Sequence, residues 1–447
     1  MKKTGKRILS CVLALLTLCS LLIPSVFAAT AQEWDENWDT LKNDSTAVSM
    51  SPGSDSSSLN FTWLSPTASC LVMFEISTDS NMKNAKMLKV ERQYTVLYGW
   101  KNTVTADQLK SDTVYYYRVA SNGKWSKTYS FKTGNDSDFN IMFVSDAQIG
   151  RSGDRKQDEV LKRDSLGWNN TLEAAVKYEP DISLIISAGD QVETAMTLEQ
   201  YNLFFNAPTL RSIPIATVIG NHDFYHPLYS IRSNNPNQFD RELLQSPAGN
   251  GYYFKRGEAL FIVLNSNNVL TYDHEELIKK AMDFYPDALW RIVVMHHSIY
   301  SRTEDDNFYR PLFSKMFDKY DIDLVLSGHD HIYTRSVMLR GDKQVSEGGT
   351  VYLEANTASG CSYDGQPEET PWYAEKCEQL RTPTYILLNF TQGKISVKAL
   401  RSDTNEIFDA FELTKSSPTK TVYKDSLLQK AYLIIADTVF KLRDLIF

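Results

Sequence analysis

The sequence predicts a chain of mixed class in which an N-terminal β-sandwich precedes an α/β domain. Over residues 47–133, short alternating runs such as LNFTWLS and TVYYYRVAS are separated by Gly, Asn, Ser and Asp turns. Several short strands at near-regular spacing are typical of a sandwich. After the linker GNDSD (134–138), apolar strands alternate with amphipathic helical stretches. That alternation indicates a sheet covered by helices on both faces.

A secretory signal peptide is predicted over residues 1–28. Four basic residues precede an apolar run that leads into SVFA, and a basic start, an apolar stretch and a small residue before the cut are its usual parts. An uncleaved anchor helix is the alternative. Cleavage after Ala28 would leave a protein that is secreted or held at the cell surface. Residues 29–46 are polar with tryptophans and are expected to form a lead-in strand or loop.

The mature chain is expected to be acidic and poor in cysteine. Of the 47 Lys and Arg residues, four lie in the signal, so 43 remain against 55 Asp and Glu, a net charge of −12. This balance argues against a surface that binds nucleic acid or anionic lipid. Three cysteines remain; Cys361 and Cys377 could pair outside the cell and leave Cys70 free, but the spacing does not decide this.

The last segment, 414–447, is predicted to be a linker followed by an amphipathic helix. Apolar residues recur at steps of four and three, the spacing of one helical stripe, at Leu428, Tyr432, Ile435, Val439, Leu442 and Ile446. The charged residues within the helix, among them Lys430, Asp437, Lys441 and Asp444, argue against a membrane span. Docking on its own chain or on a dimer partner is favoured over attachment to a membrane surface, because the charges are of both signs.

Polar residues follow the apolar strands of the α/β domain. FNIMFVS leads to Asp146 and Gln148, SLIISAG to Asp190, and IATVIG to Asn221, His222 and Asp223. RIVVM leads to His296 and His297, and IDLVLSG to His329, Asp330 and His331. Ligands of open α/β sheets bind outside the carboxyl ends of the strands. These five segments, with five of the chain's seven histidines, are therefore expected to converge at one edge.

The residue types indicate a metal centre. Carboxylates, an amide oxygen and imidazoles suit hard to borderline metal ions. One tetrahedral ion takes about four ligands, whereas at least seven are available, which favours two ions about 3.5–4 Å apart. A carboxylate is the best bridge between two cations because it has two oxygens and a negative charge. Asp190 is the expected bridging ligand.

The motifs DAQ, GDQVE, GNHD, MHHSIYS and GHDH, in this order, resemble those of the calcineurin-like metallophosphoesterases. With a fibronectin type III-like β-sandwich at 47–133 before a domain at 139–413, the chain looks most like the purple acid phosphatase-like branch. The resemblance implies a four-layer core, in which helices flank two mixed sheets, and two metal ions. Fe, Zn, Mn and similar divalent or trivalent ions would all suit, and their identity stays open.

The resemblance also assigns roles. The first metal would be bound by Asp146, Asp190 and His331, with Gln148 as a possible fourth ligand, and the second by Asp190, Asn221, His296 and His329. His222 would lie near the leaving group, its tautomer held by Asp223. Two residues depart from the family pattern. Glu193 stands where purple acid phosphatases usually have the tyrosine that gives their colour, and Gln148 stands where many relatives have histidine. Whether either residue touches a metal stays open.

The expected activity is hydrolysis of phosphate monoesters by a metal-activated hydroxide, so a phosphorylated substrate is the expected partner. A phosphodiesterase acting on nucleotides, lipid headgroups or wall polymers is the alternative, since it would share these motifs. A surface-binding protein with an inert core is a further alternative of a different class.

Overall fold

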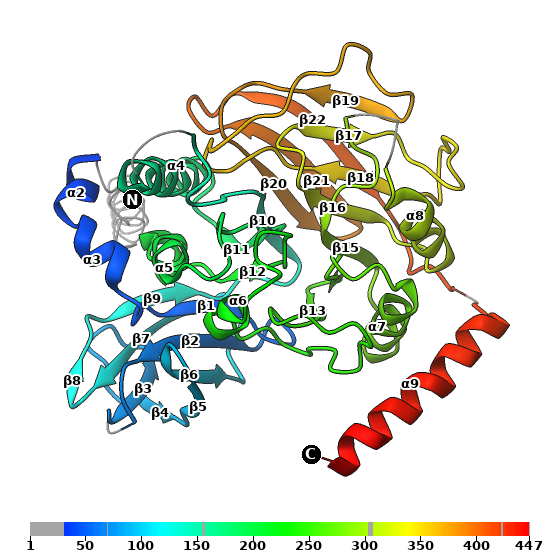
Figure 1. Cartoon of the computed structure of the whole chain (residues 1–447). Helices are drawn as coiled ribbons and strands as arrows, with labels where there is room; N and C mark the ends of the chain where they lie inside the picture. Colours follow the sequence, from blue (N-terminus) through cyan, green and yellow to red (C-terminus); the bar gives the residue numbers. More distant parts are fainter. Residues whose placement is uncertain (1–30, 69, 154–156, 303–306, 422, 447) are drawn as a thin grey trace, which may run out of the picture.

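The structure, a computed structural model, describes residues 31–68, 70–153, 157–302, 307–421 and 423–446. The predicted signal peptide at 1–28 lies outside the described residues. In Figure 1 the N-terminal sandwich lies below and beside a larger domain that holds two further sheets, and the C-terminal helix lies at one end.

The predicted β-sandwich is confirmed. Its four-stranded sheet has the order β1-β2-β6-β5, and the other has the order β4-β3-β7-β8 with β9 paired to β7. Alternating aromatic residues from both sheets, including Phe61, Phe74, Tyr117 and Phe131, pack into one core. The strands are β1 (Ser49–Pro52), β2 (Leu59–Ser65), β3 (Val72–Ser77), β4 (Lys86–Leu88), β5 (Glu91–Thr95), β6 (Gly99–Ala106), β7 (Val114–Ser121), β8 (Lys124–Trp125) and β9 (Tyr129–Lys132).

The α/β domain is built on two mixed sheets. The first has six strands in the order β12-β11-β10-β20-β21-β22, with β10, β11 and β12 parallel and β20 antiparallel to β10. These strands are β10 (Asp138–Val144), β11 (Ile182–Ser187), β12 (Ile215–Thr217), β20 (Thr384–Thr391), β21 (Lys394–Arg401) and β22 (Ile407–Thr414).

The second sheet has seven strands in the order β13-β14-β15-β16-β18-β17-β19, of which β14, β15, β16 and β18 are parallel. They are β13 (Tyr252–Arg256), β14 (Ala259–Val263), β15 (Trp290–His297), β16 (Leu324–Gly328), β17 (Tyr333–Ser336), β18 (Val351–Glu354) and β19 (Ala374–Glu378).

The four-layer arrangement is also confirmed. Apolar side chains of both sheets pack together between them. Ile141 of the first sheet and Ile292 of the second, for example, belong to one core cluster. On the outer face of the first sheet lie α4 (Gln157–Tyr178), α5 (Leu198–Phe205), the 3-10 helix η1 (Pro208–Arg211) and α6 (Leu228–Arg232). Helices α7 (Thr271–Phe284) and α8 (Arg310–Lys319) cover the second sheet. Burial of these faces is the main stabilising contribution to the domain.

The expectation of a strand or loop before the sandwich is wrong. Residues there form two short helices, α2 (Ala31–Glu36) and α3 (Trp38–Asn43). Trp34 and Trp38 lie one helical turn apart and both are buried in the core that includes α4 and α5. The indole Nε1 of Trp34 donates to Ser165 Oγ on α4 at 3.2 Å. Tertiary packing, not local propensity, fixes this segment.

The C-terminal helix α9 (Leu427–Ile446) forms as predicted but uses a different face. Tyr432, Ala436 and Phe440 are its buried apolar residues, and they pack with Leu243, Leu270 and Tyr272 of the same chain. Of the predicted stripe, Leu428, Ile435, Val439 and Leu442 are exposed. The docked face runs at steps of four, and its Tyr432 hydroxyl donates a hydrogen bond to buried Asp273. Among the described residues, no helix is both long enough and apolar enough to cross a bilayer.

Candidate metal centre

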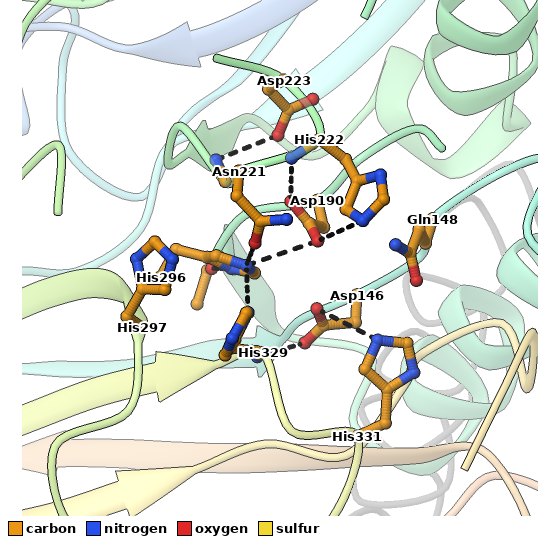
Figure 2. A network of polar contacts seen from close by, with 12 residues as sticks. Asp146, Gln148, Asp190, Asn221, His222, Asp223, His296, His297, His329 and His331 are labelled. Carbon is orange, nitrogen blue, oxygen red and sulfur yellow. Dashed lines mark hydrogen bonds and ion pairs between the residues drawn. The ribbon is translucent and has the colours of Figure 1, made fainter. Parts of the chain in front are cut away.

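The predicted convergence of the strand ends is confirmed. Loops after β10, β11 and β12 of the first sheet meet the end of β15 and the turn after β16 of the second. In Figure 2 the side chains drawn together are those of Asp146, Gln148, Asp190, Asn221, His222, Asp223, His296, His297, His329 and His331. The two sheets thus bring together donors that lie up to 185 positions apart in the sequence.

Three of these residues form a compact group. Asp146, Asp190 and His296 are all buried, and each offers one ligand atom within 4.8 Å of the other two. Around this floor lie Asn221 and His329, whose side chains reach solvent to a greater extent. The centre is therefore closed below and open on one side, as a site that admits a substrate must be.

The ring of His296 presents its Nε2 atom to this group. Its Nδ1 lies 2.9 Å from the carbonyl oxygen of Ala188, which can only accept, so Nδ1 carries a hydrogen. Nε2 faces Asp190 Oδ2 at 3.3 Å, Asn221 Oδ1 at 3.0 Å and His329 Nδ1 at 3.2 Å. In the neutral ring these are lone pairs directed at one another. Such an arrangement favours a cation at this point, either a proton on Nε2 or a metal ion.

His331 shows the same pattern on the other side. Its Nδ1 lies 3.1 Å from the carbonyl oxygen of Ser362, and its Nε2 lies 3.5 Å from Asp146 Oδ1. That carboxylate oxygen is buried and accepts no hydrogen bond, whereas Oδ2 accepts one from the backbone N–H of His329 at 3.0 Å. A buried acceptor without a donor is costly, and a metal ion would satisfy it.

The charges in the metal-free centre reflect this arrangement. Burial lowers the pKa of His296, but the charge of Asp190 outweighs it and raises that pKa to about 9. Burial likewise opposes the rise for His331, yet Asp146 raises its pKa to about 10. Burial would raise the pKa of Asp190, but His296 holds it well below its usual range. Two protons therefore occupy positions where the carboxylates favour cations.

The ligand loops adopt backbone conformations that most residues avoid. Asp146 (φ 50°), Gln148 (φ 34°), Asp190 (φ 49°), His329 (φ 89°) and His331 (φ 49°) all lie in or near the left-handed region, which costs about 1–2 kcal/mol per non-glycine residue. Glycines allow the loops to approach closely. A Cβ on Gly220 would lie 2.0 Å from Asp190 Oδ1, and one on Gly328 would lie 2.4 Å from Asp146 Oδ2.

The partner expected for His222 is wrong. Its Nδ1 donates to the carbonyl oxygen of Glu193 at 2.8 Å and lies 3.4 Å from Glu193 Oε2. Asp223 points away from the ring, as Figure 2 shows, and accepts hydrogen bonds from Tyr201 Oη at 2.9 Å and Gly220 N at 3.1 Å. Adjacent residues in this tight turn face opposite sides, so Asp223 supports the backbone of the loop while Glu193 orients the histidine.

The remaining predicted residues lie in different surroundings. His297 is buried, its Nδ1 lies 2.8 Å from Ser266 Oγ, and its ring stacks on Tyr309. It therefore packs beside the centre. Asp330, between the two histidines of its turn, accepts a hydrogen bond from Ser301. Gln148 is buried, with its Oε1 3.8 Å from the sulfur of Cys361.

The possible disulfide between Cys361 and Cys377 does not form. Both residues are free thiols, as is Cys70. Cys377 lies on β19, where its sulfur accepts a contact from Thr334 Oγ1 at 3.6 Å, while Cys361 lies in the loop that covers Asp146. The two cysteines are on separate elements with their own polar neighbours.

Two parts of the chain match known protein families, and the boundary between them agrees with that between the sandwich and the α/β domain. Residues 45–133 match the purple acid phosphatase N-terminal domain, and residues 139–333 match the calcineurin-like phosphoesterase family. The chain joins these two domains. The second match includes every residue of the metal centre named from the motifs, from Asp146 to His331.

Individual relatives are distant. An Arabidopsis thaliana protein named Fe(3+)-Zn(2+) purple acid phosphatase 12 is 24% identical over 316 residues, which are 61% of this chain and 61% of the plant protein. The alignment thus spans less than two thirds of that relative. An uncharacterized Mycobacterium tuberculosis protein is 41% identical over 56 residues, 12% of this chain and 11% of its own.

Solved structures show the same fold. The purple acid phosphatase PPD1 from yellow lupin (Lupinus luteus) seeds superposes with a TM-score of 0.65 at 16% identity, over 85% of this chain and 78% of its own. PhoD superposes with a TM-score of 0.59 at 12% identity, over 90% of this chain and 98% of its own. Both comparisons cover the sandwich and the phosphoesterase domain together.

The sequence assigns no role to two residues near the candidate metal centre. Glu193 was noted only as a departure from a tyrosine, and the structure gives it a contact with His222. Cys361 was considered only for a disulfide, and the structure places it beside Gln148. Neither contact has a short-range signal, because Cys361 is more than 200 residues from its neighbour.

Proposed function

We propose that the protein is a secreted phosphoesterase that hydrolyses phosphate monoesters at a centre of two metal ions. One observation carries the proposal: polar atoms of Asp190, Asn221 and His329 lie 3.0–3.3 Å from His296 Nε2. These atoms converge on one point where the carboxylate favours a cation, and oxygen and imidazole donors grouped in this way suit a metal ion.

The donors divide into two sets that share Asp190. One set is Asp190, Asn221, His296 and His329; the other is Asp146, Asp190 and His331, with Gln148 as a possible fourth member. Oxygen and imidazole donors of this kind suit Fe, Zn and Mn ions. Bound at such a site, two cations would generate a hydroxide near neutral pH and offset the charge on the phosphate oxygens.

His222 is placed to act on the leaving group. Its Nδ1 is held by Glu193, so the ring's other nitrogen, Nε2, is turned toward the centre and lies 4.0 Å from Asp190 Oδ2. The side chain is only partly buried and can meet a substrate that enters from the open side. Protonated at Nε2, it would donate that proton to the departing alkoxide, while the carboxylate of Glu193 stabilises the charged ring.

The colour of the protein should differ from that of purple enzymes. Glu193 occupies the position where the resemblance places a tyrosine, and a carboxylate cannot give phenolate-to-iron charge transfer. It is also engaged by Arg151 at 3.2 Å and by His222. We therefore infer that the protein lacks the purple colour that phenolate-to-iron charge transfer gives, even when iron is bound.

A substrate panel tests the proposal. The chain from Ala29 to Phe447 would be loaded with Fe, Zn or Mn, and hydrolysis of an aryl phosphate monoester would be compared with that of the matching diester. We expect two ions per chain and a higher kcat/KM for the monoester. A higher kcat/KM for the diester would instead support the phosphodiesterase alternative. No bound metal and no hydrolysis of either ester would refute the proposal.

Export is part of the same proposal and needs a separate test. The predicted signal at 1–28 supports it. Expression of the whole chain in a secreting host, followed by N-terminal sequencing of the medium fraction, should give a chain that begins at Ala29. A product retained in the cell with residues 1–28 intact would contradict it.

A further inference from the structure

The loop 355–362, which follows β18, holds the first set of metal donors together. Thr357 Oγ1 donates to the backbone oxygen of Asp146 at 2.8 Å, and Ala358 N donates to Ser145 O at 2.9 Å. Ser362 contacts His331 Nδ1 through its hydroxyl at 2.7 Å as well as through its carbonyl. One loop thus orients both Asp146 and His331.

Cys361 lies within this loop, directly between those contacts. Its thiol is buried, and the sulfur lies 3.8 Å from Gln148 Oε1, 3.7 Å from the backbone oxygen of Asp146 and 3.4 Å from Thr357 Oγ1. These neighbours are polar, whereas a structural buried cysteine usually packs among apolar groups. The thiol also interacts electrostatically with the ring of His331.

The spacing to Gln148 is that of two donors to one ion. Zinc binds sulfur at about 2.3 Å and oxygen at about 2.1 Å, so two such ligands at a tetrahedral angle lie about 3.6 Å apart. The observed 3.8 Å is close to this separation. A second feature of the same centre points to a cation: the buried Oδ1 of Asp146 accepts no hydrogen bond and lies 3.5 Å from His331 Nε2.

We propose that Cys361 is a ligand of the first metal ion and gives this site a sulfur donor. The proposal rests on the metal centre of the proposed function and makes it more specific. As the metal–sulfur bond forms, the S–H bond breaks and its proton leaves to solvent. The thiolate supplies a negative charge where Gln148 supplies none. It also shifts the preference of the site from Mg²⁺ and Mn²⁺ toward Zn²⁺, Co²⁺ and iron.

Cobalt spectroscopy tests this inference without relying on activity. The chain from Ala29 to Phe447 is stripped with a chelator and titrated with Co²⁺ to two equivalents. A thiolate ligand gives a sulfur-to-cobalt charge-transfer band in the near ultraviolet. We expect the band in the wild-type chain and in a Cys70→Ser/Cys377→Ser double variant, which keeps Cys361 as the one thiol of the mature chain. Cys361→Ser should lack it.

Zinc affinity gives a second measurement. The Zn²⁺ affinity of the first site is measured in competition with a chelator. Removal of a residue that only supports a ligand costs about 10–100-fold in affinity. If Cys361 is itself a ligand, Cys361→Ser should lower the affinity of this site by more than that. The matched variant Cys377→Ser should bind both ions as the wild type does.

The outcomes separate this inference from the proposed function. Two cobalt ions bound without a charge-transfer band in the double variant would overturn the role of Cys361 and leave the metal centre standing. This reading does not depend on whether Cys361→Ser folds. No cobalt bound to the wild-type chain would overturn the metal centre itself, and the sulfur ligand with it.

Discussion

Replacing Asp190 with asparagine tests the centre at the residue shared by both sets of donors. Its Oδ1 accepts from His222 N at 2.9 Å and its Oδ2 faces His296 Nε2 at 3.3 Å. Asparagine has the same size, so the close packing of Gly220 against this side chain is kept. One charge and one acceptor are lost. We expect fewer than two bound ions and a loss of monoester hydrolysis well beyond about 100-fold, the upper cost of losing a ligand's outer partner.

The same variant should change the stability of the metal-free protein. Although burial opposes it, the charge of Asp190 is the largest influence that raises the pKa of His296, from 6.5 to about 9. A difference of this size corresponds to about 3 kcal/mol. Because the pKa is raised in the folded state, this contribution is fully present below pH 6.5 and is lost as the pH rises through about 9. In Asp190→Asn most of it should be absent throughout.

Three measurements check these expectations: metal content by elemental analysis, hydrolysis of an aryl phosphate, and thermal unfolding of chelator-treated protein on both sides of neutral pH. Asp330→Asn is the matched control, since it makes the same chemical change in a ligand loop, at a carboxylate that contacts Ser301. The control should keep two ions. If Asp190→Asn also keeps two ions and full activity, the assignment of this residue is wrong.

Three further predictions address other parts of the molecule. His222→Gln should slow turnover by about 10²–10⁴-fold with two ions retained; loss of the metals instead would show that His222 is a ligand. Because His296 and His331 have pKa values of about 9 and about 10 in the metal-free chain, each must release a proton on binding metal. Measured by chelator competition, the Zn²⁺ affinity should therefore rise with pH below about 9, by about tenfold per pH unit for each proton released. An affinity that does not change with pH would contradict the assignment of both histidines as ligands. Trp34→Ala should lower the free energy of unfolding by about 3–5 kcal/mol without changing metal content, and an unchanged melting temperature would contradict the packing of α2 on α4.

The parts of the centre that the sequence revealed all lie at the ends of buried strands. A strand such as β10 is recognisable from its apolar run, and its carboxyl end fixes where Asp146 must lie. The same reasoning placed His296 at the end of β15 and His329 after β16. Within each sheet the parallel strands end at one edge whatever their order. That the edges of two separate sheets meet does not follow from the strands alone, and the four-layer core that the family resemblance implies supplied that part of the prediction.

Contacts that depend on side-chain direction within a turn could not be predicted. His222 and Asp223 are adjacent, yet the ring of His222 faces Glu193 and the carboxylate of Asp223 faces Tyr201. The predicted stripe of α9 and the face that docks share Tyr432 but differ in their other residues, because contacts with Leu243, Leu270 and Tyr272 far away in the sequence select the face. Cys361 reaches Gln148 from a loop beyond the last motif. Periodicity and spacing carry no information on such pairs.

The strained backbone of the ligand loops bears on what the metals contribute. Five ligand candidates with positive φ cost about 1–2 kcal/mol each, a sum comparable with the whole stability of a typical domain. Hydrogen bonds between the loops offset this cost: Asp146 N donates to Gly189 O at 3.2 Å and Gln148 N donates to Asp190 O at 2.8 Å. These bonds involve no side chain of the centre. The donors are therefore held in place by the two sheets and their glycine turns before any ion arrives, and binding energy is left for the ions and the phosphate they would meet.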